Sequence, residues 1–173
     1  MNGSQRDMRK VLVIGSGGSG KTTLARRIGA RLNIELIHLD SIYWKPGWVE
    51  TPKAEWRTIV EELVKRESWI IDGNYSGTLD VRVRACDTVI FLDLPRLLCL
   101  WRVLKRLVLN WNRNRADMAD ECREMFNLSF MLWIWGYRKR TRPRVLAMLK
   151  DSPGKRIVVL RSQREIEEFL AGI

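Results

Sequence analysis

Cysteine and histidine are scarce in this chain of 173 residues, which has three cysteines and one histidine. The cysteines, Cys86, Cys99 and Cys122, are odd in number, and their spacing fits no metal-binding pattern. Cys86 and Cys99 lie among apolar residues, so we interpret them as buried thiols, which favours a reducing compartment. The single histidine, His38, lies in an apolar stretch and is expected to be structural rather than catalytic.

Long apolar runs and targeting signals are also lacking. The longest nearly apolar run, residues 126–135, is too short to span a bilayer. No apolar segment typical of a signal peptide precedes the first expected strand, and we find no internal repeat, low-complexity segment or linker. These absences predict a single cytoplasmic domain over residues 1–173, large enough to form its core without metal or disulfides.

Negative charge is sparse in the second half of the chain. The net charge is +11, and residues 94–150 hold 13 lysines and arginines against four acidic residues. Such a basic region is typical of proteins that bind nucleic acid, an anionic membrane or a phosphorylated ligand. Because the sequence has no helix-turn-helix, RNP or zinc pattern, a phosphorylated ligand is the favoured interpretation.

A glycine-rich loop follows an apolar stretch near the N-terminus, in the sequence VLVIGSGGSGKTT at residues 11–23. Gly15-x-x-x-x-Gly20-Lys21-Thr22 is the P-loop pattern. Glycines let backbone N–H groups turn toward a phosphate, Lys21 reaches the β- and γ-phosphates, and the Thr22 hydroxyl holds Mg²⁺. The sequence therefore predicts binding of a nucleoside triphosphate, with ATP as phosphoryl donor and Mg²⁺ as cofactor. The residues of the loop expected to contact the nucleotide are Gly15, Ser16, Gly17, Gly18, Ser19, Gly20, Lys21, Thr22 and Thr23.

Apolar strands alternate with helical stretches along the chain. The expected strands are residues 11–14, 34–39, 69–71, 88–92 and 156–160. Residues 41–51 are expected to form a loop, and Ser162-x-x-Glu165 is a capping box that predicts the start of the last helix. The alternation predicts an α/β protein of three layers, with a five-stranded parallel sheet and the P-loop NTPase fold.

Three aspartates, Asp40, Asp72 and Asp93, each follow an expected strand. Ligands of parallel sheets bind at the carboxyl ends of the strands, so these aspartates and the P-loop can face one crevice. We predict that Asp72 and Thr22 hold the metal, with capping of the next turn as the alternative for Asp72. For Asp93 we favour capping. Asp40 is a candidate for orienting an acceptor hydroxyl, with a role in structuring the loop as the alternative.

Phosphoryl transfer also needs cations around the transferred group. Arg102 and Arg106, like Arg138 and Arg142, are four residues apart, so each pair shares a helix face. We predict catalytic roles for these four arginines together with Lys21 and Asp40, and a solvated helix surface is the alternative for the arginines.

Two tryptophans share the loop that follows Asp40. Trp44 and Trp48 could stack on the body of an acceptor, whereas the other tryptophans are expected to lie mostly in the core. Asp40, Trp44, Trp48 and Arg82 are therefore the predicted acceptor-binding residues.

Residues 89–106 resemble the adenylate-kinase group of P-loop kinases. They carry Leu92-Asp93-x-Pro95, with arginines nine and thirteen residues after the aspartate. The resemblance implies the strand order 2-3-1-4-5 and a helical lid after the fourth strand, here approximately residues 109–141. It also implies that Arg102 and Arg106 contact the adenine and the phosphates, and that Arg138 and Arg142 close over the phosphates from the lid.

The whole chain is similar to the DNA topology modulation proteins. The matching motifs are His38-Leu39-Asp40, Trp44-Lys45-Pro46-Gly47-Trp48, Trp69-Ile70-Ile71-Asp72-Gly73-Asn74-Tyr75 and Thr141-Arg142-Pro143. The family name implies an effect on DNA supercoiling, and the resemblance implies a fold related to the nucleotide kinases.

The chain departs from nucleoside-monophosphate kinases after Asp72-Gly73. Those enzymes carry Pro-Arg shortly after this pair, and that arginine binds the acceptor phosphate, whereas this chain continues Asn74-Tyr75-Ser76-Gly77. A nucleoside monophosphate is therefore not the expected acceptor, although Arg57, Arg82 or Arg84 could substitute for the missing arginine.

Two functions of different classes follow from these observations. The favoured one is a small-molecule kinase that uses Mg·ATP, and the alternative is a nucleic-acid-binding P-loop protein whose basic region follows a phosphate backbone. A membrane-surface helix near residues 97–111 is disfavoured, because Arg102 and Arg106 have a use in the nucleotide site. The acceptor and the oligomeric state stay open.

Overall fold

A five-stranded parallel sheet forms the centre of the computed structural model, which describes residues 8–111, 122–123 and 125–173. Its strands are β1 (Lys10–Gly15), β2 (Leu36–His38), β5 (Trp69–Asp72), β6 (Thr88–Leu92) and β7 (Arg156–Leu160). They lie in the order β2-β5-β1-β6-β7, and all neighbours pair in parallel. Counted within this sheet, the order is 2-3-1-4-5, which confirms the expected fold.

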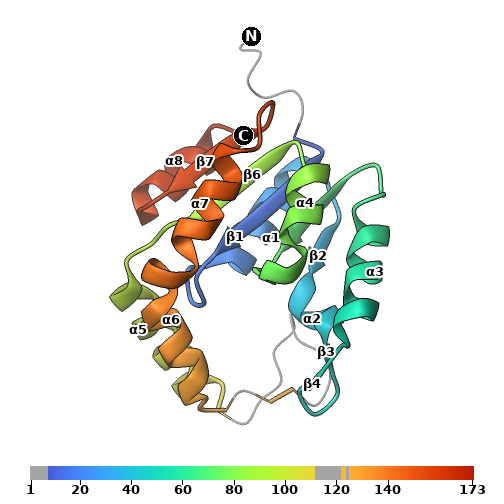
Figure 1. The fold of residues 1–173 in the computed structure, drawn as a ribbon. Coiled ribbons are helices and arrows are strands. Elements are labelled where there is room, and N and C mark those ends of the chain that lie inside the picture. The colour runs from blue at the N-terminus through green and yellow to red at the C-terminus, as the bar shows by residue number, and fades with distance from the viewer. Residues whose placement is uncertain (1–7, 112–121, 124) are drawn as a thin grey trace.

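Helices cover both faces of this sheet (Figure 1). They are α1 (Lys21–Leu32), α2 (Leu39–Tyr43), α3 (Lys53–Leu63), α4 (Leu79–Ala85), α5 (Arg96–Leu109), α6 (Leu128–Arg140), α7 (Arg142–Lys150) and α8 (Gln163–Ala171), with a 3-10 turn at Ser76–Thr78. One apolar cluster joins the sheet to α3, α4 and α7, and a second joins its other face to α1, α5 and α8. Because both faces are covered, β1 is buried along Val11–Ile14 and needs apolar residues at successive positions.

Residues 41–51, which we expected to form a loop, contain regular structure. The end of α2 is followed by β3 (Trp44–Lys45) and β4 (Val49–Glu50), an antiparallel hairpin. Two successive residues of its turn, Gly47 and Trp48, have φ of 75° and 63°. Glycine adopts this conformation without strain and tryptophan does not, so the hairpin is set by its contacts rather than by local preference.

The expected lid, residues 109–141, is only partly covered by the description, since residues 112–121 and 124 lie outside it. At its start α5 ends at Leu109, and at its end α6 begins at Leu128 after Asn127, whose side chain accepts a hydrogen bond from the Phe130 N–H. Pro143 lies in the first turn of α7, where a proline is tolerated.

Residues 122–123 lie against the β3–β4 hairpin. The Trp48 indole Nε1–H donates to the Arg123 carbonyl at 3.2 Å, and the Cys122 thiol donates to the Lys45 carbonyl at 3.6 Å. No helix within the described ranges is long and apolar enough to cross a membrane.

The capping box predicted at the start of α8 is confirmed, and its contribution to stability can be tested. The Ser162 hydroxyl accepts from the Glu165 N–H at 3.1 Å, and Glu165 accepts from the Arg161 N–H at 2.9 Å. We expect Ser162→Ala to lower the free energy of unfolding by about 1 kcal/mol and Ser162→Asp to retain most of it, measured by urea denaturation. Equal stability of Ser162→Ala and the wild type would show that water replaces the cap.

Candidate functional site

The glycine-rich loop between β1 and α1 turns through two residues in the left-handed region. Gly18 has φ of 73° and Gly20 has φ of 93°, and Gly20 begins α1 without any side-chain cap. The hydroxyls of Ser16 and Ser19 are buried and have no hydrogen-bond partner within the described part of the chain. Uncapped N–H groups and buried hydroxyls are what a phosphate would satisfy, so the loop fits the polyphosphate of a nucleotide.

Three other segments hold this loop in place. A Cβ at Gly17 would come within 2.6 Å of the Phe130 ring of α6, and one at Gly18 would meet the Cys99 carbonyl of α5. Asn74 binds the backbone of Gly15 at the start of the loop. Its Oδ1 accepts from the Gly15 N–H at 3.1 Å, and its Nδ2 donates to the Gly15 carbonyl. Sequence reasoning gave Asn74 no role, although its position two residues after Asp72 was a usable signal.

Asp72, at the carboxyl end of β5, is held by side chains from two neighbouring elements. Thr22 Oγ1 donates to Asp72 Oδ2 at 2.7 Å, and His38 Nδ1 lies 2.8 Å from Asp72 Oδ1. A carboxylate only accepts, so His38 donates there and fixes the orientation of Asp72. The hydroxyl of Thr22 and the carboxylate of Asp72 are hard oxygen ligands of the kind that Mg²⁺ prefers.

This pair fits a magnesium ion that binds mainly through water and phosphate oxygens. The residues described contain no group of three or more His, Cys, Asp or Glu side chains that could hold a metal. Mg²⁺ in nucleotide sites commonly takes one or two protein ligands and completes its shell with water and phosphate. Thr22 and Asp72 therefore suffice for the predicted metal site.

Lys21 lies beside the loop among charges of both signs. Its Nζ donates to the Ser16 carbonyl at 2.9 Å. Burial lowers the pKa of Lys21, the nearby carboxylates of Asp40 and Asp72 raise it, and Arg106 lowers it further. The charges of Arg106, Asp40 and Asp72 thus all act on Lys21.

Asp40 lies in the first turn of α2 and bonds to Tyr75. The Tyr75 hydroxyl donates to Asp40 Oδ1 at 2.7 Å, and burial, together with the charge of Asp40, raises the pKa of Tyr75. Tyr75 also packs on Tyr43 and Trp56, with ring centroids 4.6 Å and 5.0 Å away. One oxygen of Asp40 is therefore held by a neutral donor on an aromatic wall.

The two tryptophans predicted at the acceptor side lie together on the β3–β4 hairpin. Trp44 and Trp48 meet edge to face with centroids 5.3 Å apart, and Trp44 continues to Tyr43 at 5.1 Å. The aromatic cluster thus runs from the hairpin to Tyr75 beside Asp40. The Trp48 indole N–H donates to the Arg123 carbonyl, so the ring of Trp48 offers apolar contact only.

Arg82 of α4 is wholly buried, at 0 % exposure. Its guanidinium donates to the carbonyls of Gly73, Asn74, Tyr75 and Thr78 at 2.6–3.3 Å. Burial lowers the pKa of Arg82 to about 9, which still leaves the group charged at neutral pH. The structure places it under the loop that carries Asn74 and Tyr75, so its observed contacts are structural ones.

Arg102 of α5 lies at the opposite edge of the P-loop. Its Nη1 donates to the Ser19 carbonyl at 3.3 Å and its Nη2 to Gln163 Oε1 at 3.1 Å. A pocket of about 240 Å³ lies here, lined by Ser19, Gly20, Thr23, Leu24, Arg27, Arg102, Gln163 and Ile166. A flat guanidinium, an amide and apolar side chains are the groups that hold a purine base by stacking and hydrogen bonding.

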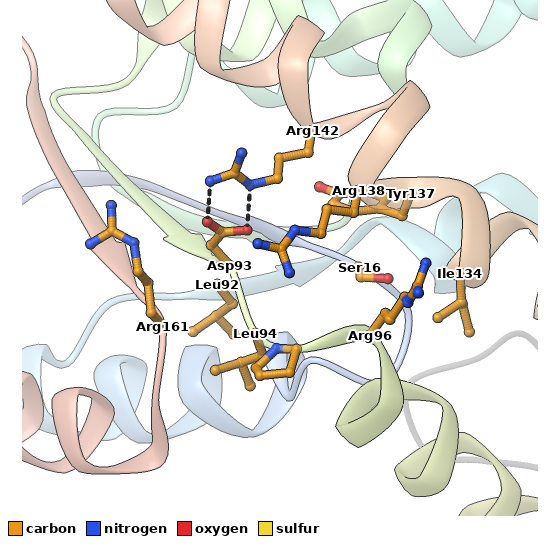
Figure 2. A pocket seen from close by; sticks show the side chains of 11 residues that line it. Ser16, Leu92, Asp93, Leu94, Arg96, Ile134, Tyr137, Arg138, Arg142 and Arg161 are labelled. Carbon is orange, nitrogen blue, oxygen red and sulfur yellow. Dashed lines mark hydrogen bonds and ion pairs between the residues drawn. The ribbon is translucent and has the colours of Figure 1, made fainter.

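A second pocket of about 240 Å³ opens on the other side of the loop, next to Ser16. Figure 2 shows Arg142 reaching down to Asp93 while the guanidinium of Arg138 lies between Asp93 and Ser16. Arg142 Nε and Nη2 donate to the two oxygens of Asp93 at 2.8 Å each, and this bonding raises the pKa of Arg142.

This pair corrects our expectation for Asp93. No side chain caps α5, and both carboxylate oxygens of Asp93 are bound by Arg142 instead. Two parallel charge-assisted hydrogen bonds from an arginine are stronger than the single bond of a helix cap. Asp93 therefore pairs with the distant Arg142 rather than with the nearby N–H groups of α5. Arg142 is therefore held beside the P-loop by an ion pair that the sequence did not indicate.

No protein-family model and no curated protein matches the chain. Solved structures do: a sugar kinase from Janibacter sp. HTCC2649 has a TM-score of 0.51 at 20% identity, with 95% of this chain and 94% of that chain covered. A shikimate kinase from Acinetobacter baumannii, in complex with shikimate, has 0.57 at 15% (95% and 90%), and a gluconokinase from Sinorhizobium meliloti 1021 has 0.53 at 16% (97% and 94%). The chain therefore has the fold of the P-loop small-molecule kinases. The resemblance to DNA topology modulation proteins stays a prediction.

Arg82 gives a stability prediction, with Arg84 on the same helix as its matched control. Arg82→Leu leaves buried carbonyls without a donor, at about 1–3 kcal/mol each, so we expect a loss of about 3 kcal/mol or more in the free energy of unfolding. Arg84 is exposed and pairs with Asp80 on the surface, so Arg84→Leu should change stability by about 0.5 kcal/mol or less. Urea denaturation measures both, and equal losses would contradict the structural role of Arg82.

Proposed function

We propose that this protein is a kinase that transfers the γ-phosphoryl group of Mg·ATP to a hydroxyl of a small molecule. The observation that carries the proposal is the bonded pair Thr22–Asp72 beside Lys21 and the P-loop. The structural neighbours point the same way, because their names are those of kinases for a sugar, shikimate and gluconate. All of these acceptors are small molecules with several hydroxyl groups.

In the donor half of the site, ATP would extend from its base near Gln163 to its phosphates near Lys21. The base of ATP would lie in the pocket that Arg102 and Gln163 help to line, and its phosphates would pass along the uncapped start of α1. Mg²⁺, held by Thr22 and Asp72, would neutralise charge on the β- and γ-phosphates. Lys21 and Arg106 supply further positive charge where negative charge develops during transfer.

On the acceptor half, Asp40 is the group we assign to the attacking hydroxyl. Tyr75 donates to one of its oxygens, and its charge raises the pKa of Lys21, which supports a place for Asp40 beside the transferred phosphoryl group. A carboxylate in this place can orient the hydroxyl and take up its proton, as the catalytic aspartate of protein kinases does.

The arginines of the acceptor side support an uncharged or weakly charged acceptor. Arg82 is used on four backbone carbonyls, while Arg57 pairs with Glu61 and Asp80, and Arg84 pairs with Asp80. The three arginines that could have replaced the missing one after Asp72-Gly73 are thus engaged elsewhere. Trp44 and Trp48 offer an apolar wall in place of an anion site.

Residues 109–141 are our proposed lid over this site. The contacts of Cys122 and Arg123 with the hairpin support that role, because they join this segment to the aromatic wall. Phe130 and Ile134 reach Gly17 from the same segment. Closing such a segment excludes water from the phosphates, which suppresses ATP hydrolysis.

Lys21→Ala tests the donor site. We expect a folded protein in which nucleotide turnover falls by several powers of ten, because the neighbouring phosphates lose their main cation. Arg26→Ala, which removes an exposed cation from the same helix, should leave turnover unchanged. Coupled ADP release measures both variants, and turnover of Lys21→Ala close to wild type would refute the P-loop assignment.

Asp40→Asn tests the acceptor site. It should retain ATP affinity, measured by titration calorimetry, while phosphoryl transfer falls by about 10²–10⁴ because the proton acceptor is lost. The exposed carboxylate of Glu61 provides the control Glu61→Gln, which should behave as wild type. ADP release is screened over polyols, nucleosides and nucleoside monophosphates. Efficient phosphorylation of AMP, CMP or UMP that survives Asp40→Asn would overturn this assignment.

A further inference from the structure

The outer face of α5 carries large apolar side chains that the fold does not use. The inner face holds the buried Cys99, Val103 and Leu107, of which Cys99 and Val103 join the core cluster of the sheet and lie against Gly18 of the P-loop. The opposite face repeats at four-, three- and four-residue spacing, which keeps its members on one side of a helix. Their exposed fractions are 67% for Leu97, 57% for Trp101, 46% for Leu104 and 78% for Val108.

A matching stripe lies on α6. Leu128, Leu132 and Trp135 are exposed at four- and three-residue spacing, opposite the buried Ile134. The two helices pack against each other, and the guanidinium of Arg96 on α5 lies 3.9 Å from the centre of the Trp135 ring on α6. The two helices lie side by side (Figure 1), and we call the exposed apolar side chains of both stripes together the α5–α6 face.

Within the two helices that the structure describes, every charged side chain is positive. Neither α5 nor α6 contains an aspartate or glutamate, whereas α5 has four and α6 has three lysines and arginines. Lys105 lies 5.2 Å from the Trp101 ring, and Lys139 continues the stripe of α6 at its exposed end. Leucine and tryptophan flanked by lysine and arginine form the pattern of helices that lie in a membrane interface.

The nucleotide site does not compete for this face. From the sequence we disfavoured a membrane-surface role for this helix, because Arg102 and Arg106 were expected to contact the nucleotide. In the structure Arg102 turns to Ser19 and Gln163, away from the stripe of Leu97 and Trp101, so one helix can serve both purposes.

We propose that the α5–α6 face binds reversibly to the surface of an anionic lipid bilayer. The apolar side chains enter the interface, and Arg96, Lys105 and Lys139 meet the anionic headgroups. A second copy of the chain fits this face less well, because it would bring Arg96, Lys105 and Lys139 of two subunits together without a carboxylate on either helix to neutralise them.

The test is sedimentation of the full chain with vesicles of phosphatidylcholine alone or with about a third phosphatidylglycerol. We expect binding only to the anionic vesicles, a blue shift of the tryptophan fluorescence, and loss of binding at high salt. Leu104→Ser with Val108→Ser should weaken binding about tenfold or more. The matched control is Val49→Ser, which alters an exposed apolar residue of the hairpin and should leave binding unchanged.

Three outcomes would overturn the proposal. One is equal binding to both kinds of vesicle or to neither. Another is unchanged binding of the double variant, which would show that the net charge of +11 alone attracts the protein. The third is a dimer in analytical ultracentrifugation that the double variant dissociates, which would identify a second copy as the occupant. Thermal melting and ADP release of the double variant without lipid confirm that its fold is intact.

Discussion

The parallel pairing of β1 with β5 decides where each polar group of the site lies. Val13 is the register partner of Asp72, and His38 of β2 is the next partner along the same row. This register places Asp72 between His38 and Thr22, and two residues later it brings Asn74 to Gly15. A slip of one residue would turn Asp72 to the other face of the sheet and lose these bonds together. Backbone pairing deep in the core is thus the precondition for the site.

The sequence could predict those features of the fold and the site that depend on residues close together in the chain. Buried parallel strands need apolar runs, and the phosphate loop needs glycines at fixed spacing, so the fold and the loop could be read directly. Asp72 ends β5 and Asp93 follows β6, so both lie at the carboxyl ends of strands, a position that follows from the chain topology. The capping box of α8 was predictable because both of its partners lie within four residues.

The misses concern side chains whose partners are distant in sequence. Arg82 and Arg84 look alike in the sequence, yet a two-residue step turns a helix by about 200°, so one is buried under a loop and the other is exposed. Asp93 was expected to cap a neighbouring helix, but its partner is 49 residues away. The hairpin at Trp44–Glu50 was missed because each of its strands has two residues, too few for an alternating pattern.

In helix α5, the apolar character of the residues does not by itself determine which face of the helix is buried. Its sequence, RLLCLWRVLKRLVL, has leucine, valine or tryptophan on two faces, and periodicity alone does not say which face enters the core. The choice is made by Gly18, since only a residue without a Cβ lets the Cys99 carbonyl approach the loop so closely. With this face turned to the loop and the core, Arg102 reaches Ser19, and Leu97 and Val108 lie outside. The geometry of the nucleotide site and the apolar outer face are therefore two consequences of the same close approach.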